Sequence, residues 1–113
     1  MNARQRLGRA GEDAAAAYLA SLGLRIVQRN VRGPAGEIDI IAREGTTIVF
    51  VEVKARRSRS FGTALGAVDA RKRKRLRAAA ADYLQFVAPG AQARFDVLAI
   101  EGDVMRLYRG AFA

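Results

Sequence analysis

The sequence contains neither cysteine nor histidine among its 113 residues. The missing cysteine excludes disulfides, thiolate zinc sites and cysteine nucleophiles, and it fits the reducing cytoplasm in which we expect the protein to reside. The missing histidine excludes Ser-His-Asp catalysis, histidine–metal sites and histidine general bases. A metal-free nucleophilic mechanism therefore has few candidate residues in this chain.

Long apolar runs are also missing. No run approaches the roughly 18 apolar residues that a membrane span needs, and the first residues lack the apolar segment of a secretory signal. The chain is 50% hydrophobic, so it can bury a real core. Its length allows one compact domain, residues 1–113, and is too short for two.

Acidic residues are scarce in one stretch of the chain. The net charge is +9, and residues 54–77 contain ten basic residues and one acidic residue, whereas the rest of the chain is close to neutral. A concentrated basic patch favours a polyanionic partner, and nucleic acid is the first candidate. The alternative is an ordinary solvated helix face. An anionic membrane surface is disfavoured because the segment lacks an amphipathic aromatic face.

Hydrophobic periodicity predicts a helix over residues 4–22, strands over 24–31, 37–43 and 47–54, a helix over 70–87, and strands over 93–100 and 103–109. Residues 55–63 are predicted to form a loop and residues 64–68 a helical turn, and Asp69 is a suitable N-cap for the second helix. The order α-β-β-β-α-β-β predicts an α/β fold with a mixed central sheet flanked by helices. Three aromatic residues are expected in the core rather than as base-stacking platforms: Tyr83, Phe86 and Tyr108.

Two strand-like runs carry ionisable residues that a buried strand would normally avoid. Gly36–Ala42 contains Glu37 and Asp39, and Thr47–Lys54 contains Glu52 and Lys54. A hairpin through Gly45 would bring Asp39 beside Glu52 and Lys54, because side chains alternate between the two faces of a strand. Carboxylate oxygens suit Mg²⁺ or Mn²⁺, and the lysine could orient water or stabilise a phosphate oxygen. The alternative is a buried ion pair, with Lys54 reaching solvent from the end of its strand.

These motifs in order resemble those of a known family. The segments that match are Gly11-Glu12, Arg29-Asn30-Val31-Arg32, Gly36-Glu37-Ile38-Asp39, Phe50–Arg56, Phe61-Gly62, and Lys72 with Leu76. The sequence is similar to the PD-(D/E)xK nuclease superfamily and its Holliday-junction-resolvase-like branch, and more closely to the YraN family of uncharacterised bacterial proteins. The resemblance extends to about residue 100. It implies a restriction-endonuclease-like fold, although Ile38 occupies the position of the signature proline.

The resemblance also implies the residues of a candidate site. Glu12, Asp39, Glu52 and Lys54 would form the catalytic core, with the three carboxylates binding metal and the lysine assisting the attacking water. Glu12 could instead be a surface carboxylate that pairs with Arg9. Glu37, Asn30 and Arg32 are candidates for supporting roles around the core.

Nucleic-acid binding is predicted for the basic residues that follow the second motif: Arg56, Arg57, Arg59, Lys72, Arg73, Lys74, Arg75 and Arg77. Lys72 matches the family by position only. The resemblance implies a metal-dependent endonuclease acting on branched DNA, and the alternative is a nucleic-acid-binding module with a silent site. A homodimer would present two sites to the two strands of a symmetric junction.

Overall fold

The computed structural model describes residues 3–56 and 69–113, excluding the side chains of residues 3–10 and Arg56. Its helices are α1 (Ala3–Ser21) and α3 (Ala70–Val87). Its strands are β1 (Arg25–Gly33), β2 (Gly36–Glu44), β3 (Thr47–Arg56), β4 (Ala93–Glu101) and β5 (Val104–Phe112). The predicted element order is confirmed, and the helical turn predicted at residues 64–68 lies outside the described part of the chain.

The five strands form one sheet in the sequential order β1-β2-β3-β4-β5. Strand β3 pairs with β4 in parallel, and the other neighbouring strands pair antiparallel. Helix α3 lies in the crossover between the parallel strands, as such a connection requires. The sheet is therefore mixed, which confirms the predicted α/β class.

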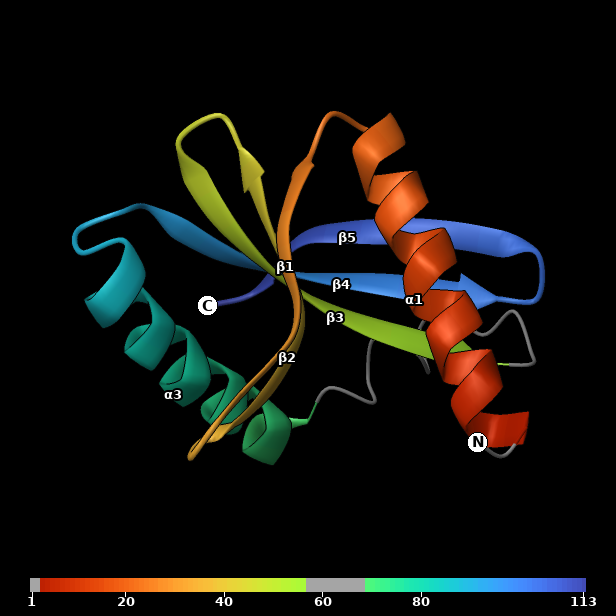
Figure 1. Ribbon diagram of the computed structural model, residues 1–113, viewed down its shortest axis with the longest axis horizontal. Coiled ribbons are helices and arrows are strands. Elements are labelled where there is room, and N and C mark those ends of the chain that lie inside the picture. The colour runs from red at the N-terminus through yellow and green to blue at the C-terminus, as the bar shows by residue number, and fades with distance from the viewer. Residues whose placement is uncertain (1–2, 57–68) are drawn as a thin grey trace.

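A helix lies on each side of the sheet, with α1 on one face and α3 on the other (Figure 1). Ala15 and Leu19 of α1 are buried against one face, among side chains such as Val49 and Leu98. On the other face, Leu76, Ala79 and Ala80 of α3 pack against residues that include Phe50 and Val97. The two apolar layers hold both helices against the strands that carry the candidate site.

Short-range signals set the ends of these elements. The Asp69 carboxylate accepts a hydrogen bond of 2.9 Å from the Lys72 backbone N–H, which caps α3 as the sequence predicts. Gly45 adopts φ 61° in the turn between β2 and β3, a conformation that glycine tolerates. The predicted hairpin is confirmed, with Glu44 paired with Thr47 across the turn.

Two predictions about boundaries or burial were wrong. Strand β3 extends through Arg56, so Ala55 and Arg56 continue the pairing with β4 instead of beginning a loop. Phe86 was predicted to be in the core, yet it is 82% exposed, because the buried face of α3 does not extend to this position.

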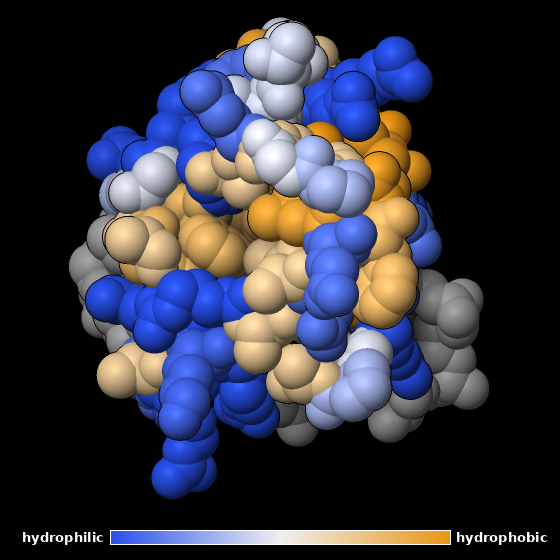
Figure 2. Space-filling view, turned by 90° about the vertical axis from the view of Figure 1, so that its left-hand side faces the viewer, coloured by the Kyte–Doolittle hydropathy of each residue, from blue (hydrophilic) through white to orange (hydrophobic). Residues whose placement is uncertain are grey.

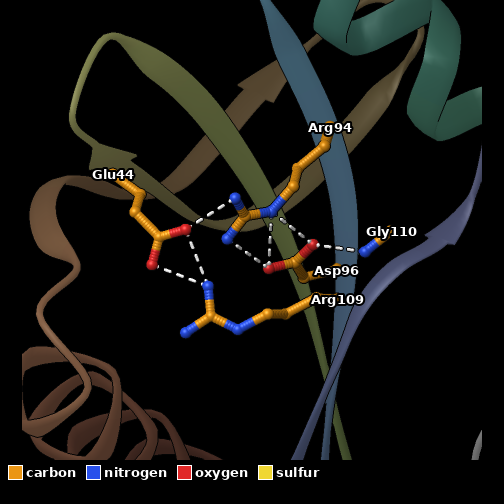
Figure 3. A network of polar contacts seen from close by, with 5 residues as sticks. All are labelled: Glu44, Arg94, Asp96, Arg109 and Gly110. Carbon is orange, nitrogen blue, oxygen red and sulfur yellow. Dashed lines mark hydrogen bonds and ion pairs between the residues drawn. The ribbon is translucent and has the colours of Figure 1, made fainter.

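A polar network ties the start of β4 to β5 and to the β2–β3 turn (Figure 3). Asp96 is fully buried, and its carboxylate binds the Arg94 guanidinium at 3.0 Å and the Gly110 N–H at 2.9 Å. The register of β4 and β5 shifts between Phe95 and Val97. Asp96 therefore satisfies a backbone donor that the bulge leaves outside the ladder. Hydrogen bonds from Arg109 and Arg94 lower the pKa of Glu44, at the outer side of the network.

Replacing Asp96 with alanine should destabilise the fold by about 3 kcal/mol, because the Gly110 N–H loses its acceptor and Arg94 keeps only Glu44 as a partner. The measurement is urea unfolding beside an Arg109→Ala control, which removes only the more exposed ion pair with Glu44. We expect a much smaller loss in the control. Equal losses in the two variants would contradict the structural role of Asp96.

Candidate active site

Strands β2 and β3 separate where the two acidic motifs meet. The last paired residues are Ile40 and Val51. Asp39 is the neighbour of Ile40 on β2, and Glu52 is the neighbour of Val51 on β3, so both carboxylates lie just outside the paired region. Beyond this point the Val53 N–H donates a hydrogen bond of 2.8 Å to the Asp39 carboxylate, not to a strand carbonyl. The hairpin was predicted to bring Asp39 and Glu52 together. It does so at the end of the ladder, where a carboxylate takes the place of the next backbone acceptor.

The Asp39 carboxyl is held in an environment that disfavours its charge. Burial and the adjacent Glu52 charge raise the pKa of Asp39 from 3.8 to about 7, despite the opposing hydrogen bond from Val53. Hydrogen bonding with Glu52 and the charge of Glu12 also raise this pKa. Two carboxyl groups this close carry a cost when both are ionised, and a bound cation would relieve it.

Glu52 lies between two lysines and is only 4% exposed. Its Oε1 is 3.6 Å from the Lys54 Nζ and 3.2 Å from the Lys72 Nζ. Its Oε2 is buried and accepts no hydrogen bond from the part of the chain that the structure describes. A buried carboxylate oxygen without a partner is costly, so the Glu52 side chain has a free ligating atom inside the site. Lys72, which the sequence matched by position only, reaches the same carboxylate from α3.

Glu12 approaches the site from α1. Its carboxylate accepts a hydrogen bond of 3.1 Å from the Asn30 amide, and its backbone carbonyl accepts one of 3.4 Å from Arg29. Arg29 also pairs with Asp13 at 2.7 Å. Asn30 has φ 52° in the part of β1 that faces Asp39 across the ladder. Asn30 therefore holds Glu12 near Asp39. The side chain of Arg9, the alternative partner of Glu12, lies outside the described part of the chain.

The remaining supporting residues lie farther out. Glu37 pairs with Arg32 at 3.7 Å, and their side chains are 41% and 81% exposed. This pair lies beside the turn of the β1–β2 hairpin. Among the described residues, neither side chain forms a hydrogen bond or ion pair with Asp39 or Glu52, so their supporting roles stay predictions.

Asp39 and Glu52 are the best candidate metal ligands at this site. Within residues 3–56 and 69–113, no group of three acidic side chains gathers closely enough to bind a metal ion together. Magnesium commonly binds one or two protein carboxylates and fills its other positions with water and phosphate oxygens. The carboxylate pair with its free Glu52 oxygen fits that requirement. Glu12 contributes charge and a nearby oxygen, and direct ligation by Glu12 stays a prediction.

The basic residues of α3 differ in exposure. Arg71, Lys74, Arg75 and Arg77 are exposed, whereas Lys72 and Arg73 are partly buried. Arg73 lies over the Phe112 ring at 5.5 Å, and Arg77 donates a hydrogen bond of 3.0 Å to the Ala113 carbonyl. Arg71, Lys74 and Arg75 therefore form the better candidate surface for a polyanion. The side chains of Arg56, Arg57 and Arg59 lie outside the described part of the chain.

Sequence reasoning missed a second buried carboxylate. Glu101 is fully buried at the end of β4, and neither of its carboxylate oxygens accepts a hydrogen bond in the structure as described. It pairs across the ladder with the backbone of Arg56. Its position before Gly102 looked like an exposed hairpin residue, so the sequence contained no signal of its burial.

These features define an α/β protein with a carboxylate–lysine cluster where two strands of a mixed sheet diverge. The chain belongs to the family described as Uncharacterised protein family UPF0102, whose model matches residues 11–100. The resemblance to the YraN family is thereby confirmed. No helix in the described part of the chain is both long and apolar enough to cross a membrane.

Relatives in this family match nearly the whole chain. A UPF0102 protein of Shewanella loihica is 50% identical over 105 residues, covering 93% of this chain and 92% of the relative. One from Moorella thermoacetica is 54% identical over 98 residues, covering 86% and 82%. One from Desulfosudis oleivorans is 46% identical over 115 residues, covering 99% and 94%. The residues that the family model matches include Glu12, Asp39, Glu52, Lys54 and Lys72.

Proposed function

We propose that this protein is a divalent-metal-dependent endonuclease that hydrolyses phosphodiesters, with branched DNA as its substrate class. The observation that carries the proposal is the Asp39–Glu52 carboxyl pair, in which the partly buried Asp39 has a pKa of about 7 and the buried Glu52 has an oxygen without a partner among the described residues. Two carboxyl groups side by side, each disfavouring the charge of the other, are the arrangement that a bound divalent cation would stabilise. The branched substrate rests on the resemblance to Holliday-junction-resolvase-like nucleases.

Asp39 and Glu52 would hold the Mg²⁺ or Mn²⁺ ion, and Glu12, whose charge acts on Asp39, would support the site from α1. When bound, such an ion lowers the pKa of water and neutralises developing charge on phosphate. The Val53 N–H fixes the Asp39 carboxylate in place. Glu12 is likewise fixed by Asn30.

The two lysines have different positions relative to this pair. Lys54 extends from β3, two residues beyond Glu52, and would orient the attacking water or stabilise its developing negative charge. Lys72 extends from α3, beside the exposed basic residues, and would neutralise Glu52 and attract the phosphate. Their Nζ atoms already approach the same Glu52 oxygen, so both lie within reach of a bound phosphodiester.

A nucleic-acid-binding module with a silent site is the second candidate. The exposed basic residues of α3 favour it, because Arg71, Lys74 and Arg75 could hold a phosphate backbone without any metal. The two functions differ in the need for the carboxylate pair. Binding alone would survive its loss, whereas hydrolysis would not.

The deciding experiment is cleavage of four-way junctions, flaps and linear duplexes by the purified protein with Mg²⁺, Mn²⁺ or Ca²⁺. We expect hydrolysis with Mg²⁺ or Mn²⁺ and none with Ca²⁺. The matched control is Glu52→Gln, which keeps the size of the side chain and removes its charge. Cleavage by this variant at the wild-type rate would assign the activity to another site or to a contaminant.

Replacing Arg71, Lys74 and Arg75 together with glutamine should weaken duplex binding for all sequences about equally. It should also reduce the slope of log affinity against log salt by up to about 0.9 per lost phosphate contact. The measurement is fluorescence anisotropy at several salt concentrations. The matched control replaces Arg25 and Arg43, an exposed pair facing each other across the far end of β1 and β2. An unchanged slope in the triple variant would place the polyanion surface elsewhere.

A further inference from the structure

A hollow of about 370 Å³ opens between α3 and the tip of the β1–β2 hairpin. Figure 2, which looks at the side of the molecule carrying α3, shows apolar surface gathered around a hollow and bordered by hydrophilic side chains. Its walls include Val31, Pro34, Ala79, Tyr83 and Phe86. This volume is within the range of pockets that bind small organic groups, about 300–1,000 Å³.

Two aromatic rings, those of Tyr83 and Phe86, line the hollow. Phe86 is 82% exposed, although a solvated aromatic ring on a helix surface offers nothing to the fold. Tyr83 is fixed by an edge-to-face contact with Phe50, their ring centroids 5.9 Å apart. An exposed ring beside a fixed ring, with an apolar floor, is suited to a flat aromatic ligand.

The charged residues around the hollow indicate which chemical groups of a ligand it can bind. Asp82 lines the wall, so a phosphate would be repelled from the interior. A carboxylate there can accept hydrogen bonds from an amino group. Arg32 lies at the rim with a side chain that is 81% exposed. The hollow therefore combines an interior for an aromatic amine with a cationic rim for a phosphate.

The hollow is connected to the carboxylate site along one face of α3. Lys72, Arg75, Ala79, Asp82 and Phe86 follow one another at intervals of three or four residues, which places them on one stripe of the helix. Lys72 contacts Glu52, and the Cβ of Arg75 lies 3.8 Å from where a side chain at Gly36 would begin. The two basic residues of this stripe, Lys72 and Arg75, therefore lie on the side of the hollow that faces the candidate active site.

We infer that this hollow binds an unpaired nucleobase of the nucleic-acid substrate. The base would stack on Phe86 and Tyr83 and donate its amino group to Asp82, while Arg32 and Arg75 hold the flanking phosphates. From Lys72 to Tyr83, α3 rises about 16 Å at about 1.5 Å per residue. That distance equals about five nucleotide steps of about 3.4 Å. This inference rests on the proposed function and specifies its substrate as one with an unpaired base at that distance from the cut.

A second copy of the chain is the competing occupant. Two copies joined through this face would bring their exposed Arg71, Lys74 and Arg75 side chains near each other, at an electrostatic cost. A polyanion is attracted by the same residues. The charge of α3 therefore favours nucleic acid over self-association.

The test is binding, without cleavage, of a DNA flap that carries 2-aminopurine as an unpaired base about five nucleotides from the branch, the position at which we expect the cut. With Ca²⁺ present, wild-type protein should change the fluorescence of the stacked base. Phe86→Ala should weaken binding of the flap about fivefold or more, in line with base–aromatic stacking, and change duplex binding less than twofold. Val87→Ala is the matched control, because Val87 is exposed on the same turn but does not line the hollow. Asp82→Asn should reduce a preference for adenine over thymine at the unpaired position.

Unchanged flap affinity in Phe86→Ala would overturn the inference, as would an unaltered 2-aminopurine signal on wild-type binding. Light scattering that shows a wild-type dimer and a Phe86→Ala monomer would assign the hollow to self-association instead. The readout does not depend on hydrolysis. A protein that stacks the base but cleaves nothing would end the nuclease proposal alone, and one that cleaves with an unaffected Phe86→Ala variant would end this inference alone.

Discussion

Asp39→Asn should abolish metal-dependent cleavage while making the metal-free protein more stable at neutral and alkaline pH. The amide has nearly the shape of the carboxyl group but cannot supply a charged ligand, so we expect a loss in rate of at least about a hundredfold. The gain in stability follows from the pKa of about 7, because the wild-type protein must fold with a carboxylate that its surroundings disfavour. We expect a gain of about 1–3 kcal/mol at pH 8, or at least about 4 °C in melting temperature.

The direction of the pH dependence can be stated in advance. An unfolded aspartate titrates near 3.9, whereas the pKa of Asp39 in the folded protein is raised to about 7. Between these values the folded state retains the proton that the unfolded state has lost, so this group's contribution to stability falls as pH rises from about 4 to 7. The difference between Asp39→Asn and wild type should therefore grow over this window and level off above it.

Thermal melts in EDTA from pH 5 to pH 8 would measure this difference. The matched control is Glu37→Gln, an exposed carboxylate on the same strand, for which no such growth is expected. Added Mg²⁺ should reduce the difference in stability between Asp39→Asn and the wild type, because it stabilises only the wild type. A gap that stays constant with pH would show that Asp39 does not carry the raised pKa, and unchanged metal affinity would remove it from the metal site.

The affinity for metal should also depend on whether Asp39 is protonated. At pH 6 most Asp39 side chains in the free protein would be protonated, and the ion must displace that proton to bind. Calorimetric titration with Mn²⁺ should therefore show weaker affinity at pH 6 than at pH 8, by about tenfold, and a heat that varies with the ionisation enthalpy of the buffer. A pH-independent affinity would contradict ligation by Asp39.

The hairpin that joins Asp39 to Glu52 could be predicted because its signals are local. Two apolar runs, a short turn with Gly45 and alternating side chains are all contained within about twenty residues. The end of the β2–β3 ladder was not predictable. It depends on the Asp39 carboxylate accepting the Val53 N–H, and a sequence does not show whether a side chain or a backbone carbonyl will satisfy a given donor.

Contacts between distant elements were the part that sequence reasoning could not give. Lys72 reaches Glu52 only because α3 packs on the sheet in one particular register, which is set by Leu76, Ala79 and Ala80. The burial of Glu101 and the exposure of Phe86 could not be predicted for the same reason. A hairpin glutamate is buried and a helical phenylalanine is exposed, and both outcomes depend on where the covered part of the sheet ends.

Lys54→Ala should leave metal binding and DNA binding within about twofold of wild type while lowering the cleavage rate by about a hundredfold or more. The expected loss is in kcat, because the lysine acts on charge that develops as the water attacks and contributes little to ground-state affinity. A loss of this size is typical for removal of one preorganised electrostatic group. Glu52 would keep Lys72 as its partner at 3.2 Å, so the variant should remain folded.

Lys72→Ala is the matched comparison, because it removes an ammonium from the same Glu52 oxygen without touching β3. Lys72 should act mainly through phosphate binding, so its loss should raise KM more than it lowers kcat. Single-turnover cleavage of a four-way junction or flap, with anisotropy measured in Ca²⁺, separates the two effects. Equal losses of kcat in both variants would mean that the lysines only balance the charge of Glu52.

Cleavage by Lys54→Ala at the wild-type rate would exclude the lysine from the mechanism. If wild-type protein fails to cleave any of these substrates with Mn²⁺, the binding module is the better description, and the lysines then serve the phosphate backbone alone.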